Sequence, residues 1–302
     1  MSTPYDSQRV KTILAERGAQ VETYLQHCLD AIPMQGRLKD AMYYSLLAGG
    51  KRLRPVLCLS TASLFGLPTE ATMPFAAALE MIHTYSLIHD DLPAMDDDDL
   101  RRGRPSCHKA FDEATAILAG DALLTDAFGF MASAAQTLPA ERVLRALGAV
   151  SSAAGAAGMV GGQILDMDCT GKTDVPLETL QTLHALKTGA LFRVACISGG
   201  LLAGASESGL DCLRAYGEAL GVTFQIVDDI LDETADTATL GKPVGSDAEM
   251  GKTTYPSLMG LERSRELAQS FADKAVESLN GLSGPDASFL KGLALMLVTR
   301  KK

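Results

Sequence analysis

Apolar residues recur at helical spacing along nearly the whole chain, and the alternation typical of β-strands is scarce. Ala and Leu, which both favour helix, dominate these stretches. Most prolines fall between the stretches or in their first turns, where a missing backbone N–H costs little. The pattern predicts an all-α protein with helices over residues 6–31, 37–48, 55–66, 74–91, 110–137, 140–169, 177–204, 207–232, 257–279 and 286–299.

The chain shows no boundary between domains. No low-complexity linker, charge shift or solenoid repeat divides residues 1–302, so a single helical domain is expected. The longest stretches without a helical pattern are 92–109 and 233–256, and each follows an acidic segment. Long loops inside a compact domain are usually functional, which directs attention to these two.

One uncharged run, residues 146–165, is long enough to span a bilayer. It consists mainly of Ala, Gly and Ser, whereas a lipid-facing helix is richer in Leu, Ile and Phe. We therefore expect a buried, closely packed helix here and no membrane span. The six Cys lack C-x-x-C spacing and the N-terminus lacks an apolar signal core, which indicates a reducing compartment, the cytoplasm.

The negative charge is concentrated in two segments. The chain has 37 Asp and Glu against 27 Lys and Arg, a formal net charge of −10, which argues against a nucleic-acid partner bound through general basic charge. Residues 90–99 carry six acids and residues 228–236 carry five. Without these eleven charges the net charge would be +1, so the rest of the protein is close to neutral.

The second acidic segment, FQIVDDILD (224–232), suits a metal site. On a helix Asp228 and Asp232 share a face, with Gln225 one turn earlier, and two carboxylates so placed repel each other. Carboxylate oxygens are ligands that Mg²⁺ prefers, together with waters and phosphate oxygens. The alternative is a solvated acidic face, although the helix dipole disfavours acids at a C-terminus.

The first acidic segment ends a helix with Asp90 and Asp91. Asp96, six residues after Asp90, would lie about 240° away on a straight helix, but Pro93 breaks the helix and lets Asp96 fold back. An Asp-rich solvated loop is the alternative. A calcium loop of the EF-hand type needs acids at alternate positions and then Gly, and Leu100 and Arg101 exclude it.

Basic clusters accompany the acidic segments. They are Gly49-Gly50-Lys51-Arg52 with Arg54, the Arg101–Arg104 segment, Lys187-Thr188-Gly189, and Lys242 and Lys252 in the second loop. Ordinary surface ion pairs, worth ~0–1 kcal/mol each, are one reading. The other is phosphate binding by glycine-flanked N–H groups and Lys or Arg donors. Acids for Mg²⁺ and cations for phosphate, in one apolar helical chain, indicate a diphosphate substrate with an apolar tail.

Seven segments in order resemble one known family. They are GGKRLRP (49–55), HDDLPAMDDDDLRRGRP (89–105), GGQILD (161–166), KTGAL (187–191), FQIVDDILD (224–232), GKPVGSD (241–247) and KTTYP (252–256). Over nearly its whole length the chain resembles the short-chain trans-isoprenyl diphosphate synthases of the polyprenyl synthetase family, most of all the bacterial farnesyl type. A single DDxxD segment is weak evidence, but this ordered set is specific.

The resemblance implies an isoprenoid synthase fold, a helical bundle around a central apolar cavity, and a homodimer. It implies three Mg²⁺ ions per site, held through the motif residues Asp90, Asp91, Asp96, Asp228 and Asp232, with Asp229 in support. It assigns the isopentenyl diphosphate headgroup to Lys51, Arg54, His83 and Arg102. It assigns the allylic diphosphate side to Arg101, Lys187, Thr188, Gln225 and Lys242.

The implied reaction condenses isopentenyl diphosphate with dimethylallyl or geranyl diphosphate and gives farnesyl diphosphate. Tyr85, five residues before Asp90, lies ~7.5 Å along the helix from it, and with Ser86 it is expected to close the cavity below the growing chain. Tyr85 as an ordinary core residue is the alternative. Residues 100–109 and 236–252 are expected to be lids.

Three other functions stay open from the sequence. A geranyl or geranylgeranyl diphosphate synthase differs only in product length. A class I terpene cyclase would lack the isopentenyl pocket, whereas Lys51 and Arg54 are present. A non-catalytic subunit would have eroded acidic motifs, whereas both are intact.

Overall fold

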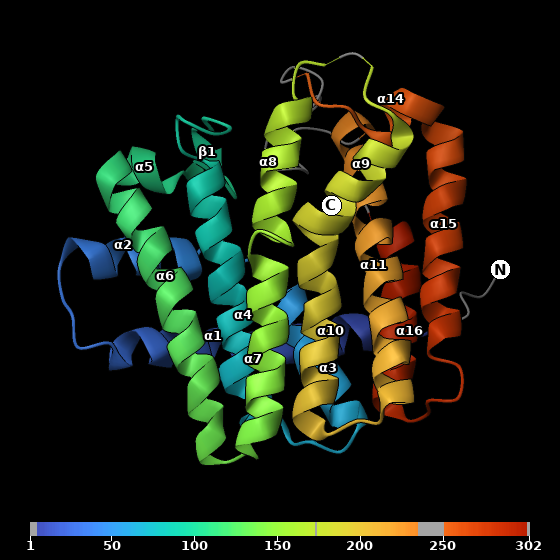
Figure 1. Ribbon diagram of the computed structural model, residues 1–302, viewed down its shortest axis with the longest axis horizontal. Helices are drawn as coiled ribbons and strands as arrows, with labels where there is room; N and C mark the ends of the chain where they lie inside the picture. Colours follow the sequence, from blue (N-terminus) through green and yellow to red (C-terminus); the bar gives the residue numbers. More distant parts are fainter. Residues whose placement is uncertain (1–4, 173, 235–250, 301–302) are drawn as a thin grey trace.

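The computed structural model describes residues 5–172, 174–234 and 251–300. Over these residues the chain is a bundle of helices with one short hairpin, as Figure 1 shows. The α-helices are α1 (Ser7–Ala31), α2 (Arg37–Leu46), α3 (Leu53–Leu64), α4 (Thr69–Asp90), α5 (Cys107–Ala110), α6 (Glu113–Ser133), α7 (Ala140–Ala154), α8 (Met159–Cys169), α9 (Leu177–His184), α10 (Ala190–Ala203), α11 (Glu207–Thr234), α14 (Tyr255–Met259), α15 (Leu261–Ser278) and α16 (Pro285–Val298).

Side-chain caps explain several helix starts. Asp6 accepts hydrogen bonds from the amides of Gln8 and Arg9 at the start of α1. Asp112 accepts from the amide of Thr115 at the start of α6, and Thr254 forms a capping box with Ser257 before α14. Such caps satisfy N–H groups that the first helical turn leaves free. Local sequence therefore fixes these helix starts.

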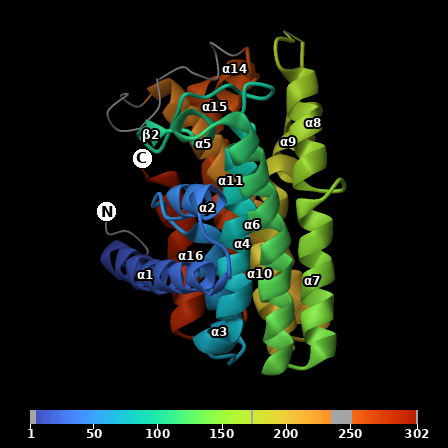
Figure 2. The same ribbon diagram turned by 90° about the vertical axis from the view of Figure 1, so that its left-hand side faces the viewer.

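The helix α10 forms the centre of the bundle. It contacts α3, α4, α7 and α11, and most of its side chains are buried. The core around it is built largely from Ala, Leu, Val and Cys, which explains how so many helices can pack closely around one helix. Figure 2 shows α7 and α8 on one outer face and α1 on the opposite one.

The predicted all-α class is confirmed, with breaks or irregular turns in four predicted helices. The predicted helix 257–279 divides at Gly260 into α14 and α15. The predicted helix 140–169 is broken, because Gly155 to Gly158 form a turn between α7 and α8. The apolar run 146–165 is therefore not one helix. The predicted helix 177–204 contains a π-helical turn, η2 (Ala185–Gly189), between α9 and α10. The predicted helix 110–137 begins at Glu113 as α6 and ends in a 3₁₀ turn, η1 (Ala134–Gln136).

Helix starts also differ from the positions that proline suggested. The helix α3 begins at Leu53, ahead of Pro55, and α4 begins at Thr69, ahead of Pro74. Pro55 lies in the first turn of α3, where a missing N–H costs no intrahelical hydrogen bond. Pro74 lies inside α4 and removes one such bond, which the helix tolerates.

The predicted loop 92–109 contains an antiparallel hairpin and a short helix. The strands β1 (Leu100–Arg101) and β2 (Arg104–Pro105) pair across Arg102 and Gly103, which both have positive φ. Two positive φ values suit the tight turns that follow strand twist. The residue types Arg102-Gly103 do not predict this turn, because Asn-Gly and Asp-Gly are the usual residues there. The hairpin, α5 and α14 lie at the same end of the bundle, at the top of Figure 1.

Three largely helical segments are long and apolar enough to cross a membrane by length and composition alone: Glu113–Gln136, Ala140–Cys169, which includes the turn between α7 and α8, and Leu177–Ala203. In the third, 67% of the most apolar window is buried inside the protein, against 39% in the other two. The absence of a membrane span stays a prediction.

A buried ion pair joins the N-terminal helices. The guanidinium of Arg52 donates to Glu80 at 2.7 Å and to the Leu46 carbonyl at 2.8 Å, and both charged side chains are at most 2% exposed. Glu22 of α1 adds a contact of 3.3 Å but is 45% exposed. Arg52 thus links α1, α2 and α4 at the start of α3, directly beside Lys51.

Replacing Glu80 by Ala is expected to lower the free energy of unfolding by about 3–5 kcal/mol, because it leaves the buried Arg52 charge with only the exposed Glu22 as a carboxylate partner. Glu22→Ala is the matched control, since it removes an exposed partner of the same Arg52 and should cost ~0–1 kcal/mol. Urea unfolding of both variants tests this, and equal losses would contradict the dominance of the buried pair.

Candidate active site

An apolar cavity of about 480 Å³ opens at the end of α4. Its wall includes Leu87, Met95, Met159 and Leu191, from four different segments. Polar groups interrupt this wall: Arg54, His83, Asp90, Gln163, Lys187 and Thr188. The cavity therefore combines an apolar interior with charged groups, which suits a ligand with an anionic head and an apolar tail.

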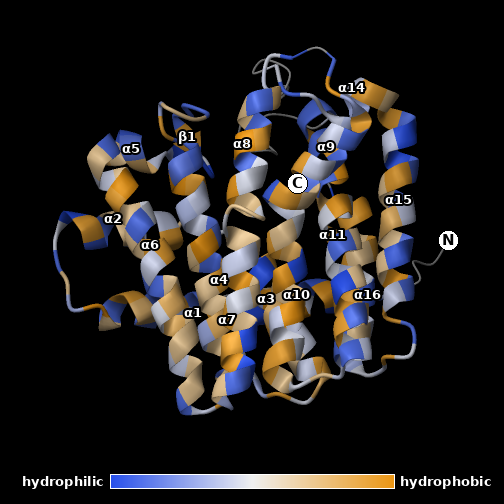
Figure 3. Cartoon of the chain, viewed as in Figure 1, coloured by the Kyte–Doolittle hydropathy of each residue, from blue (hydrophilic) through white to orange (hydrophobic). Residues whose placement is uncertain are grey.

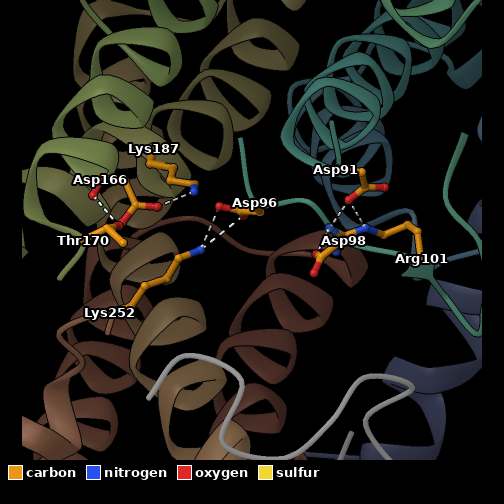
Figure 4. Close-up of polar contacts among 8 residues, drawn as sticks. All are labelled: Asp91, Asp96, Asp98, Arg101, Asp166, Thr170, Lys187 and Lys252. Carbon is orange, nitrogen blue, oxygen red and sulfur yellow. Dashed lines mark hydrogen bonds and ion pairs between the residues drawn. The ribbon is translucent and has the colours of Figure 1, made fainter. Parts of the chain in front are cut away.

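The first acidic motif folds back as Pro93 suggested. The amide of Asp96 donates to the carbonyl of Asp90 at 2.9 Å, which closes the turn after α4. Burial raises the pKa of Asp90 to about 6; the charge of Lys187 opposes this rise and that of Asp96 adds to it. Lys252 lies 3.2 Å from both carboxylate oxygens of Asp96, as Figure 4 shows.

Asp91 has a different environment from Asp90. Its carboxylate accepts a hydrogen bond from Arg101 Nε at 2.9 Å and is 2% exposed. Arg101 also donates to Asp98 at 2.9 Å, so one guanidinium joins two motif carboxylates (Figure 4). In this arrangement Asp91 orients Arg101 and is neutralised by it.

Lys187 projects from the π-helical turn η2. Its ammonium donates to Asp166 of α8 at 2.6 Å (Figure 4). Burial alone would lower the pKa of Lys187, but Asp166, Asp90 and Asp96 together raise it, so the side chain stays cationic. Gly162 of α8 makes this approach possible, because a Cβ there would lie 2.2 Å from the Lys187 amide nitrogen. π-turns of this kind are frequent at functional sites.

A chain of hydrogen bonds continues from η2 into the second acidic motif. Thr188 donates to Gln225 Oε1 at 2.8 Å, and Gln225 Nε2 donates to Asp229 at 2.9 Å. The other oxygen of Asp229 accepts from the Tyr255 amide at 3.0 Å. Asp229 is 3% exposed, so it joins α11 to α14 from inside the protein.

Asp228 and Asp232 point to different surroundings. Asp228 is half-exposed and pairs with Arg300 at 2.5 Å, whereas Asp232 is buried. Arg300 follows α16 near the C-terminus and also lies over the Phe224 ring, 4.4 Å from its centroid. Asp228 is not part of the cavity wall in the described part of the chain.

The expected headgroup residues gather near the GGKRLRP segment. Arg54 and His83 line the cavity, and the Arg102 guanidinium donates to the Gly49 carbonyl, two residues before Lys51. Burial lowers the pKa of Arg54 to about 10, and its buried Nε has no hydrogen-bond partner among the described residues. Burial and the charges of nearby arginines hold the pKa of His83 well below its usual value, so this ring is neutral.

The remaining predicted site residues fall in two places. Tyr85 and Ser86 both line the cavity, and Tyr85 is 6% exposed. Lys242 and most of the expected lid 236–252 lie outside the described residues. The other expected lid, 100–109, is the hairpin and α5, and Tyr44 of α2 donates to its Pro105 carbonyl at 2.7 Å.

Among residues 5–172, 174–234 and 251–300, no three Asp, Glu, His or Cys side chains gather as a metal-binding group. The chemistry of the first motif nevertheless fits Mg²⁺. Asp90 and Asp96 supply carboxylate oxygens, and the charge of Asp96 is close enough to raise the pKa of Asp90. Mg²⁺ takes only one or two carboxylates when substrate phosphates and waters complete its shell.

Comparison with known proteins decides the family. The polyprenyl synthetase family model matches residues 35–281. The chain belongs to this family. It is 48% identical over 288 residues to the farnesyl diphosphate synthase of Escherichia coli, which covers 94% of this chain and 96% of the relative.

Other relatives differ in the product they are named for. A large subunit of a heterodimeric chloroplastic geranylgeranyl pyrophosphate synthase from Arabidopsis thaliana is 46% identical, covering 90% of this chain and 75% of that protein. The crystal structure of an FPP/GFPP synthase from Zymomonas mobilis superposes with a TM-score of 0.85 at 37% identity, covering 97% of this chain and 100% of that one.

The polyprenyl synthetase assignment confirms the predicted family, isoprenoid synthase fold and enzyme class. This chain is a prenyltransferase of isoprenoid biosynthesis, a short-chain prenyl diphosphate synthase. The names of its relatives span farnesyl, geranylgeranyl and geranylfarnesyl products, so membership alone leaves the product length open.

Two partners of this prenyl synthase site, Asp166 and Arg300, received no role from the sequence, and Lys252 was named only as a member of a basic cluster. Asp166, Lys252 and Arg300 each form an ion pair with a predicted site residue. Asp166 ends the GGQILD segment and Lys252 begins KTTYP, so motif membership could have drawn attention to both. No pattern marks Arg300, which lies 72 residues from its partner.

Proposed function

We propose that this prenyl synthase condenses isopentenyl diphosphate with dimethylallyl and geranyl diphosphate to give farnesyl diphosphate. The observation that carries this proposal is the cavity, which has Asp90 and Lys187 in its wall and the Tyr85 ring one helical turn further along α4. Such a cavity suits a diphosphate with an apolar tail of limited length. The farnesyl synthases among its relatives support the same product.

The two substrates are proposed to bind at two basic groups. Isopentenyl diphosphate binds Lys51, Arg54, His83 and Arg102. The buried Nε of Arg54, which has no partner in the part of the chain that the structure describes, supports this. The allylic diphosphate binds Arg101, Lys187, Thr188, Gln225 and Lys242. Two members of this group already pair with carboxylates, Arg101 with Asp91 and Asp98, and Lys187 with Asp166.

The proposed cofactor is Mg²⁺, three ions per site, held by Asp90, Asp96 and Asp228 with Asp91, Asp229 and Asp232 in support. Bound Mg²⁺ would stabilise negative charge on the leaving diphosphate. Lys252 and Arg300 hold Asp96 and Asp228 by ion pairs that a metal would have to displace.

The residues of this chain are proposed to stabilise developing charge and to exclude water from the cavity. Lys187 and Arg101 stabilise charge that develops on the diphosphate as the allylic carbon–oxygen bond breaks. The apolar wall excludes water from the allylic cation, which the double bond of isopentenyl diphosphate then attacks. A carbon–carbon bond forms, and the proton lost from the adjacent carbon passes to the released diphosphate. No protein nucleophile is needed.

Tyr85 is proposed to limit product length, with Ser86 beside it. The Tyr85 ring is almost fully buried in the cavity wall, and aromatic bulk there leaves less depth for a longer chain. A geranyl or geranylgeranyl synthase is the second candidate, because relatives of similar identity carry geranylgeranyl names.

Purified protein is expected to consume isopentenyl diphosphate with either allylic starter when Mg²⁺ is present, and to stop when EDTA removes it. Chromatography should show farnesyl diphosphate as the main product. Asp90→Asn should lower turnover at least about a hundredfold, the scale of losing one preorganised electrostatic group. Asp273→Asn, an exposed change on α15, is the control. No consumption would reject the synthase, and a mainly geranylgeranyl product would favour the second candidate.

Tyr85→Ala is expected to shift the product to geranylgeranyl diphosphate or longer, because it removes the ring that bounds the cavity. Tyr85→Phe keeps the ring and should keep the farnesyl product. Chromatography of the products from both variants decides this, and a purely farnesyl product from Tyr85→Ala would mean that Tyr85 is only a core residue.

The cytoplasm is proposed as the location of this protein because its six cysteines are unpaired.

A homodimer is proposed from the outer layer of the bundle. Figure 3 shows hydrophobic residues among hydrophilic ones on α6, α7 and α8. Leu118 of α6 is 56% exposed and Leu144 of α7 is 67% exposed, and neighbouring apolar side chains are exposed too. Large apolar side chains gathered on an outer face suit contact with a second copy of the chain.

The wild-type protein is expected to sediment as a dimer, and the Leu118→Glu/Leu144→Glu variant as a monomer, because charge at an apolar interface opposes burial. Leu258→Glu introduces the same charge at an exposed position of α14 and should leave the dimer intact. Sedimentation velocity measures all three, and a monomeric wild type would refute the proposal.

A further inference from the structure

His89, the residue before the first acidic motif, lines the same cavity as Tyr85 and has no role in the proposed reaction. The two residues are four apart on α4, so they share a face of the helix. Their rings meet edge to face, with centroids 5.7 Å apart and planes at 83°. His89 is therefore packed directly against the ring that is proposed to limit product length.

Two features fix the His89 ring from the side of α6. Its Nε2 lies 3.0 Å from the carbonyl oxygen of Ile117, and because a carbonyl only accepts, Nε2 is the protonated nitrogen that donates. Gly120 provides the space, since a Cβ at this position would lie 2.2 Å from Nε2. The carboxylate of Asp121 is 3.9 Å away and 59% exposed, so it contributes little.

The Tyr85 ring is positioned by packing against its neighbours. It belongs to the buried hydrophobic core, and the His89 ring meets it edge to face. The His89 ring, itself fixed by the Ile117 carbonyl, provides a rigid edge for it. Rings in this geometry attract each other beyond the simple burial of area.

We propose that His89 is a positioning residue for product length: it holds the Tyr85 ring across the cavity, and Gly120 is the glycine that lets it do so. The inference rests on the proposed role of Tyr85. It assigns no proton transfer and no substrate contact to His89. His89 acts through two groups: Nε2, which donates to the Ile117 carbonyl, and the ring, which contacts Tyr85.

His89→Ala is expected to raise the ratio of geranylgeranyl to farnesyl product about tenfold, the scale of losing one ring contact and one hydrogen bond. His89→Gln, whose amide can replace the Nε2 donor, should restore part of the farnesyl selectivity. Thermal unfolding is measured alongside, because a purely structural role would lower stability without changing the product ratio.

Gly120→Ala tests the same role of the His89 ring without changing His89 or Asp90. Its Cβ must displace the His89 ring, so the product ratio should shift in the same direction as in His89→Ala. Gly129→Ala is the matched control on the same helix, because nothing lies within 4 Å of a Cβ there. A shift with Gly129→Ala equal to that with Gly120→Ala would overturn the assignment.

The Tyr85→Ala background separates the two proposals. If His89 acts through Tyr85, then His89→Ala should add nothing to the product ratio of Tyr85→Ala, whereas independent effects would add. If Tyr85→Ala lengthens the product and neither His89→Ala nor Gly120→Ala does, the role of His89 is refuted alone. If Tyr85→Ala itself leaves the product unchanged, both the limit at Tyr85 and the role of His89 are refuted, while synthase activity stands.

Discussion

Compensation of carboxylate charge is the constraint on which the active end of this protein depends. Carboxylates near an apolar cavity lose hydration and repel one another, so each needs a cation or donors. In the structure these partners come from other elements: Asp96 pairs with Lys252, Asp91 with Arg101, Asp166 with Lys187, and Asp228 with Arg300. The pairs join the hairpin, α8, η2 and the C-terminal residues to one site. Charge compensation thus determines the arrangement of these segments.

Fold class was predictable because helical periodicity and Ala- and Leu-rich composition agree along the whole chain. The differences between the predicted and observed elements have local causes that the amino-acid composition does not indicate. The break between α7 and α8 occurs in a stretch of Gly and Ala that reads as helix. The π-turn η2 depends on Gly162 in a different helix, whose missing Cβ admits the Lys187 backbone. The hairpin depends on positive φ at Arg102, which sequence preference would assign to Asn or Gly.

Site residues divide in the same way. Asp90, Lys187, Arg54 and Tyr85 could be named from motifs, and all four line one cavity. Their partners could not be named, because an ion pair between residues such as Asp228 and Arg300 depends on how distant helices pack. The sequence also does not show that the neighbouring acids of DDILD differ in burial. Asp228 is half-exposed, whereas Asp229 is buried and accepts a hydrogen bond from the Tyr255 amide. Adjacent residues of the same type can therefore have opposite environments, because they point to different sides of α11.

The volume of the cavity affects both the stability of the fold and the binding of an apolar tail. Emptied of all contents, about 480 Å³ would cost ~10 kcal/mol at the rate found for core cavities, which is comparable to the whole stability of a domain. The free enzyme therefore needs water in this space, and the polar groups Asp90, Lys187 and Thr188 make it wettable at one end. The apolar side chains around the cavity are not covered by other helices. An apolar tail that displaces the water covers these side chains, and this burial favours binding. Under the proposed role of Tyr85, the position of its ring limits the length of tail that fits, so rigidity at that ring would affect substrate binding as well as product length.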